Sequence, residues 1–182
     1  IMPSLVGSEM CIRDSNQCSF FDILKNIMSK ILGVYCLLIG TKDGIYVLRD
    51  TYGIRPLSLC FNEKTNSYCV ISENSDIEHK HGYRFVNNIK PGTIGKLDRN
   101  GYSTLYSKFK IFTPCSFEYI YFLNKSSIVD DVDVSVFRYK CGVTMARNDT
   151  DFKKYENVIV CGVPETGITS GIGYADTLDI KY

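Results

Sequence analysis

The sequence lacks several features that mark common classes of protein. Its 21 basic and 20 acidic residues give a formal net charge of +1, and this balance provides no basic face for nucleic-acid phosphates or anionic lipid. No apolar run approaches the roughly twenty residues of a membrane helix, and no signal peptide opens the chain. We therefore expect a soluble cytoplasmic protein with no nucleic-acid partner and no membrane partner.

Cysteine is plentiful, with eight residues in a chain of 182, but the spacing of a metal or redox site is missing. No Cys-x-x-Cys pair occurs, which excludes a locally encoded zinc ribbon or redox dithiol. Most of the cysteines lie within hydrophobic segments, so we expect buried thiols in a reducing compartment. His79 and His81 suggest a metal pair, although two imidazoles without a third ligand are more often solvent-exposed.

Hydrophobic spacing predicts both helices and strands. Apolar side chains recur at helical intervals over 20–32, which predicts a core helix. Apolar runs separated by Asp-Gly, Pro-Gly and Asn-Gly turns predict a mostly antiparallel sheet, with strands at 34–39, 44–49, 57–61, 68–72, 84–86 and 93–97. The continuous β-branched run at 158–163 is typical of a parallel strand covered on both faces, and the residues after Pro164 turn the chain into a helix.

Three blocks carry a family resemblance in the expected order. They are Arg-Asp-Thr-Tyr-Gly-Ile-Arg-Pro-Leu at 49–57, Cys-Ser-Phe-Glu-Tyr-Ile-Tyr-Phe at 115–122, and Val-Pro-Glu-Thr at 163–166 followed by Gly-Tyr-Ala at 173–175. Together they resemble the amidophosphoribosyltransferase (glutamine phosphoribosylpyrophosphate amidotransferase) family. The aromatic alternation of the second block predicts a strand at the junction of two domains, and residues 134–146 resemble the family helix that follows it.

The resemblance implies a fold of the α+β and α/β classes. Residues 16–113 would be the C-terminal part of an Ntn-hydrolase glutaminase α/β/β/α sandwich, and residues 114–182 the start of a type I phosphoribosyltransferase domain. Residues 1–15 have no counterpart in the family and resemble a translated sequencing adapter, with a natural leader as the alternative. Neither the amino-terminal nucleophilic cysteine nor the acidic phosphate-binding loop of the family is present, so we expect an inactive internal fragment that holds no catalytic residue.

The resemblance also implies an activity and a set of site residues. Such enzymes transfer the amide nitrogen of glutamine to phosphoribosyl pyrophosphate, which gives 5-phosphoribosylamine in the first committed step of de novo purine synthesis, and the full-length protein would be a homo-oligomer. Glu165 and Thr166 would bind phosphoribosyl pyrophosphate at a helix start, Thr166 would also bind Mg²⁺, and Cys115 would be one ligand of the 4Fe-4S cluster of some members. On the residues alone, Thr166 and Thr169 are helix caps and Cys115 is a buried thiol.

Departures from the family pattern keep other functions open. The family's Arg-Pro-Asp after the junction is replaced by Asn-Lys-Ser at 124–126, which leaves open a non-catalytic regulatory or assembly homologue. A different amidotransferase with the same nucleophile class would explain the hairpins but not residues 158–175. The charged turn of Arg49, Asp50 and Arg55 is interpreted as architectural.

Overall fold

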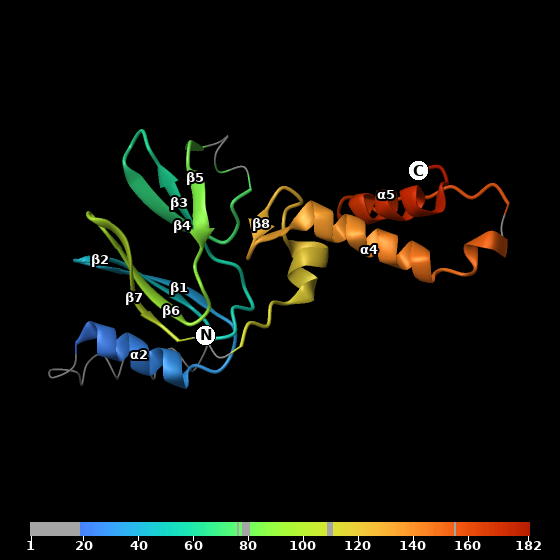
Figure 1. Ribbon diagram of the computed structural model, residues 1–182. Coiled ribbons are helices and arrows are strands. Elements are labelled where there is room, and N and C mark those ends of the chain that lie inside the picture. The colour runs from blue at the N-terminus through green and yellow to red at the C-terminus, as the bar shows by residue number, and fades with distance from the viewer. Residues whose placement is uncertain (1–18, 76, 78–80, 109–110, 155) are drawn as a thin grey trace. The chain divides into compact units, whose positions relative to one another are not determined.

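The structure is a computed structural model that describes residues 19–75, 77, 81–108, 111–154 and 156–182 (Figure 1). Contacts divide the chain into two compact units: unit 1 contains the residues up to Arg55 and Ile89–Pro114, and unit 2 contains Pro56–Asn88 and Cys115–Tyr182. Because residues 56–88 group with the later part of the chain, the assignment of 16–113 and 114–182 to two enzyme domains stays a prediction. Residues 1–15 lie outside the described residues.

Unit 1 is a helix packed on an antiparallel sheet. Helix α2 (Phe20–Lys30) begins where the Ser19 hydroxyl accepts a hydrogen bond from the Asp22 amide, as a serine N-cap does. The sheet has the order β1-β2-β6-β7, and its strands are β1 (Cys36–Thr41), β2 (Gly44–Arg49), β6 (Thr93–Asp98) and β7 (Gly101–Ser107). The buried core is Leu24 and Met28 of α2 against Leu48 and Ile94 of the sheet. The predicted helix is confirmed, and so are the Asp-Gly turn between β1 and β2 and the Asn-Gly turn between β6 and β7.

Unit 2 combines a second small sheet with a helical pair. Its three-stranded antiparallel sheet has the order β4-β3-β5, with β3 (Ser58–Asn62), β4 (Ser67–Ile71) and β5 (Arg84–Asn88). The short strands β8 (Ile128–Val129) and β9 (Val132–Asp133) precede α4 (Val134–Asn148), the 3₁₀ turn η2 (Phe152–Lys154) and α5 (Thr166–Leu178). The predicted strands before and after the Pro-Gly turn therefore exist, but β5 and β6 belong to different sheets.

The junction segment at 115–122 is not the strand that its aromatic alternation predicts. It forms the π-helix η1 (Glu118–Phe122), in which the Leu123 amide donates to the Glu118 carbonyl at 2.9 Å. Four residues apart, Phe117 and Tyr121 stack with their ring centroids 5.3 Å apart, so these aromatic residues also satisfy a helical spacing. The prediction was wrong because the pattern is compatible with both periods.

The predicted parallel strand at 158–163 is also wrong. In the described residues this run forms one parallel bridge, between Ile159 and Lys181, and the Val160 amide donates to the Lys181 carbonyl at 2.8 Å. Ile159 is 70% exposed and Val163 is 77% exposed. A parallel strand is stabilised by hydrogen-bonded neighbours and covered faces, and the described residues supply only this single contact.

Candidate functional site

The residues predicted to bind substrate, Glu165 and Thr166, lie at the first turn of α5. Glu165 is the N-cap residue, in the right-handed helical conformation, and makes no side-chain capping hydrogen bond. Its side chain is exposed, whereas Thr166, the first residue of the helix, is half-buried. Thr166 is therefore not the N-cap, and Thr169 lies inside the helix, so the capping interpretation of both threonines is wrong.

The main-chain amides of this turn are less available than the sequence suggests. The Gly167 amide donates to the Val163 carbonyl at 3.0 Å, and the Ile168 amide donates to the Glu165 carbonyl at 3.3 Å. An anion at this helix start would therefore meet two amides that already have main-chain acceptors. The positive end of the helix dipole and the Thr166 hydroxyl are the features that remain for an anionic ligand.

Close contact with α4 sets the position of α5. A Cβ atom added at Gly142 would lie 1.9 Å from the Ser170 carbonyl oxygen, and one added at Gly173 would lie 2.3 Å from the Tyr139 carbonyl oxygen. The Ser170 hydroxyl also donates to the Arg138 carbonyl at 2.9 Å. Because only glycine allows this approach at both points, the sequence itself specifies how α5 lies against α4.

A second contact holds the loop that leaves α4. The Tyr174 hydroxyl of α5 donates to the carboxylate of Asp149, and the other carboxylate oxygen accepts the amides of Asp151 and Phe152 at 2.8 and 3.2 Å. The hydrogen bond from Tyr174 is the main reason that the pKa of Asp149 lies below its ordinary value, and the same bond raises the pKa of Tyr174. The Gly-Tyr-Ala block therefore acts in packing.

The described residues contain no group of three or more His, Cys, Asp or Glu side chains that would hold a metal ion. Cys115, the predicted cluster ligand, is a half-buried free thiol. The expectation that most cysteines are buried is wrong for the described part of the chain, because only Cys60 is buried and Cys161 is exposed. His79 lies outside the described residues, and His81 is exposed.

Sequence reasoning missed a hydrogen-bonded connection around Glu73. One carboxylate oxygen of Glu73 accepts the Asn124 amide at 2.7 Å and the Ser127 hydroxyl at 3.0 Å, and the Asn74 side chain accepts the Ile128 amide at 3.1 Å. These bonds connect the residues after β4 to the segment in which the family's Arg-Pro-Asp is replaced. The separation of more than fifty residues hides this relationship from any local pattern.

The charged turn at Arg49 has the geometry of an architectural element. Arg49 is fully buried, and its guanidinium donates to the carbonyls of Arg55, Ile89 and Gly53 at 2.9, 2.6 and 3.1 Å. One oxygen of Asp50 accepts the amides of Tyr52 and Gly53, each at 2.9 Å. Since these bonds all go to main-chain atoms, the turn fixes the backbone, in agreement with the interpretation from sequence.

Comparison with known proteins gives a consistent set of relatives, although no family model matches the chain. Amidophosphoribosyltransferase of Rattus norvegicus is 32% identical over 176 residues, which covers 87% of this chain and 33% of the relative. The Drosophila melanogaster enzyme is 34% identical over 81% of this chain and 29% of the relative. The Bacillus subtilis enzyme is 30% identical over 94% of this chain and 35% of the relative.

Solved structures agree with the sequence relatives. Glutamine phosphoribosylpyrophosphate amidotransferase from B. subtilis, complexed with ADP and GMP, matches 94% of this chain and 36% of its own, with a TM-score of 0.83 and 30% identity. A structure described as the allosteric regulatory enzyme of purine biosynthesis matches 96% of this chain and 36% of its own, with a TM-score of 0.85 and 30% identity. The fold is thus that of a region of a purine-synthesis amidotransferase. The chain belongs to the amidophosphoribosyltransferase family, and it spans about a third of the length of the curated relatives it matches.

None of the described helices combines the length and the apolar character that a membrane crossing requires.

Proposed function

We propose that this chain is part of an amidophosphoribosyltransferase. The complete protein would use glutamine, water and phosphoribosyl pyrophosphate, and would form 5-phosphoribosylamine, glutamate and pyrophosphate. The observation that carries the proposal is the match of 94 to 96% of the chain to two such structures with TM-scores of 0.83 and 0.85. The relatives described above are all named for the enzyme, which gives no support to a non-catalytic homologue.

Within this proposal, Glu165 and Thr166 form part of the phosphoribosyl pyrophosphate site. The positive end of the α5 dipole favours a pyrophosphate, and the Thr166 hydroxyl is not used as a helix cap. The exposed Glu165 carboxylate would repel the pyrophosphate unless a cation lay between them.

The oxygen atoms of these two residues fit magnesium. This ion usually takes one or two protein oxygens and completes its shell with water and substrate phosphates, and a carboxylate next to a hydroxyl is such a set. Bound Mg²⁺ would neutralise charge that develops on the departing pyrophosphate. In the same step, Thr166 would orient the pyrophosphate against the helix start.

The described residues do not fit an iron-sulfur cluster. Such a cluster requires four ligands, and no group of three or more candidate ligands surrounds Cys115 in the described part of the chain. No step of the proposed reaction is therefore assigned to a cluster. A homo-oligomeric state and a cytoplasmic location of the complete protein belong to the same proposal, and they rest on the family resemblance.

The test is expression of the complete transcript that carries this sequence, followed by an assay for phosphoribosylamine that requires both glutamine and phosphoribosyl pyrophosphate. Thr166→Ala should raise the KM for phosphoribosyl pyrophosphate and the Mg²⁺ concentration needed for half-maximal rate, whereas Thr166→Ser should behave like the parent protein. Thr169→Ala, one turn into α5, is the matched control. A complete protein that forms no phosphoribosylamine would refute the proposal, and an unchanged KM in Thr166→Ala would remove Thr166 from the site.

A further inference from the structure

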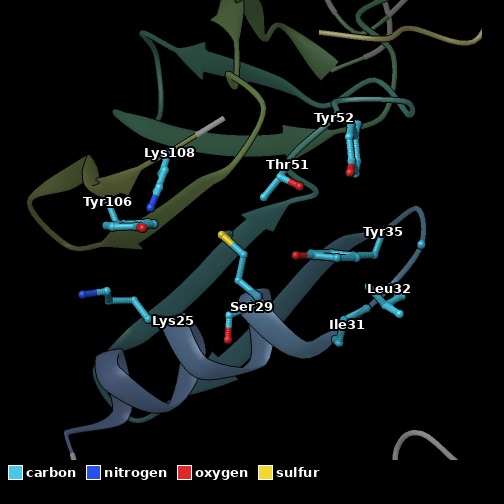
Figure 2. Close-up of a pocket in the computed structure, with 11 residues that line it drawn as sticks. Lys25, Ser29, Ile31, Leu32, Tyr35, Thr51, Tyr52, Tyr106 and Lys108 are labelled. Atoms are coloured by element: carbon cyan, nitrogen blue, oxygen red, sulfur yellow. The ribbon is translucent and has the colours of Figure 1, made fainter. Parts of the chain in front are cut away.

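Unit 1 contains a pocket whose lining residues are not among those assigned to the phosphoribosyl pyrophosphate site. It has a volume of about 260 Å³ and lies between α2, the segment that follows it, and the residues after β2 and in β7 (Figure 2). The polar lining residues are Lys25, Ser29, Tyr35, Thr51, Tyr52, Tyr106 and Lys108. Met28, Ile31 and Leu32 add apolar surface, so the pocket combines a polar part with an apolar part.

The Tyr35 hydroxyl is the most informative group in the pocket. It is directed towards the middle of the cavity in Figure 2, and it is buried with no hydrogen-bond partner. Burial, with smaller effects from Asp50 and Cys36, raises the pKa of Tyr35 to about 12, so the phenol keeps its proton. A buried donor without a partner costs free energy, and this cost is recovered when a ligand presents an acceptor oxygen.

The charge of the lining favours an anionic acceptor. No Asp or Glu lines the pocket, whereas Lys25 and Lys108 do. The Asp50 carboxylate acts on Tyr35 from outside the lining, and the two lysines must outweigh this negative charge. The Lys25 ammonium lies 5.1 Å from the centroid of the Tyr106 ring, and Lys108 lines the same pocket. Among the described residues neither lysine has an ion-pair partner. A negative ligand would supply the missing counter-charge.

We propose that this pocket binds a small organic anion, namely a carboxylate attached to one flat apolar ring. Tyr35 donates a hydrogen bond to a carboxylate oxygen, and Lys108 provides the counter-charge. The ring lies on the apolar lining beside Met28. The volume, slightly below the usual range for drug-sized ligands, admits one ring and one acidic group. None of the pocket residues is among those that the proposed function assigns to the phosphoribosyl pyrophosphate site, Glu165 and Thr166.

The test measures the binding of benzoate to the 182-residue chain by saturation-transfer NMR. Benzoate should bind with a Kd of about 1 mM, a value ordinary for so small a ligand. Benzyl alcohol, which keeps the ring but has no charge, and inorganic phosphate, which has charge but no ring, should each bind about tenfold more weakly. Equal affinities for benzoate and benzyl alcohol would overturn the proposal. So would a result in which phosphate binds and benzoate does not.

Two variants identify the groups responsible. Tyr35→Phe and Lys108→Met should each weaken benzoate binding about tenfold, the loss typical of a hydrogen bond to a charged group. Lys42→Met, an exposed lysine in the β1–β2 turn, is the matched control and should bind benzoate like the parent chain. Lys108→Gln replaces the methionine variant if that variant does not fold. Binding that is unchanged in both pocket variants would place benzoate elsewhere and refute the proposed site.

Discussion

The Nε atom of Arg138 donates to the carbonyl oxygen of Tyr119 at 2.8 Å, so a side chain of α4 completes the hydrogen bonding of η1. The same guanidinium donates to the Leu123 carbonyl at 2.7 Å and to the Tyr121 carbonyl at 3.4 Å. The last carbonyls of a helix lack partners within it, and water cannot serve them easily here because Arg138 is only 4% exposed. The arginine therefore takes the place of water at the end of the π-helix.

Replacing Arg138 should destabilise unit 2 strongly. We expect Arg138→Met to lower the free energy of unfolding by about 3 kcal/mol, because two or three buried carbonyls lose a charged donor. Urea unfolding measures this loss. Arg147→Met, at an exposed position on the same helix, should change stability by less than about 0.5 kcal/mol. Equal losses in the two variants would mean that the hydrogen bonds to η1 contribute no net stability.

Two glycine positions should respond in opposite directions to alanine. Gly142→Ala places a methyl group 1.9 Å from a main-chain oxygen of α5, and the helices must separate, at a cost of about 1 to 3 kcal/mol. Gly167→Ala meets nothing closer than 3.7 Å, and its better helix propensity should add up to about 1 kcal/mol. Thermal unfolding of both variants checks the prediction. A Gly142→Ala variant as stable as the parent would show that α4 and α5 leave room for a methyl group at this point.

The Cys60 thiol should make stability fall in alkaline solution. Burial, with a contribution from its cross-strand neighbour Cys69, raises the pKa of Cys60 to about 12 from an ordinary value near 9. Above about pH 9 the folded state keeps a thiol proton that the unfolded state releases. The contribution of Cys60 to the free energy of unfolding is therefore complete below about pH 9 and is lost as the pH rises towards 12. Denaturant unfolding across this interval measures the slope, which should be smaller in Cys60→Ala. Equal slopes would mean that Cys60 titrates normally.

Arg49 should tolerate no substitution that removes its forked geometry. Lysine keeps the charge but cannot donate at once to three carbonyls in different directions, so we expect Arg49→Lys to cost about 2 kcal/mol of stability. Arg99→Lys, at an exposed position, serves as the control and should be neutral within about 0.5 kcal/mol. The measurement is again urea unfolding, and an equally neutral Arg49→Lys would leave charge as the only requirement at this position.

Local signals were sufficient for much of the fold. The helical spacing of 20–32 predicted α2, and Asp-Gly and Asn-Gly placed turns that the positive φ angles of Gly44 and Gly101 confirm, at 131° and 109°. They failed where neighbours distant in sequence decide the conformation. The segment 115–122 becomes a π-helix in contact with Arg138, and the run 158–163 has a single bridge in place of flanking strands.

The candidate sites likewise have some features that the sequence predicted and others that only the structure shows. The motif at 163–166 was found from sequence, whereas the amide partners of Gly167 and Ile168 and the exposure of Glu165 were not. The pocket around Tyr35 has no local signature, because its lining comes from segments more than seventy residues apart.

By itself, the order of residues determined the position of α2 and of the hairpin turns, and the family that the chain resembles, because these depend on side-chain spacing and on backbone freedom within a few residues. Only the tertiary structure decided that η1 is helical, that Glu73 reaches Asn124, and that the Tyr35 hydroxyl has no partner. Where local preference allows two conformations, the presence or absence of a hydrogen-bonding partner far along the chain decides which one forms.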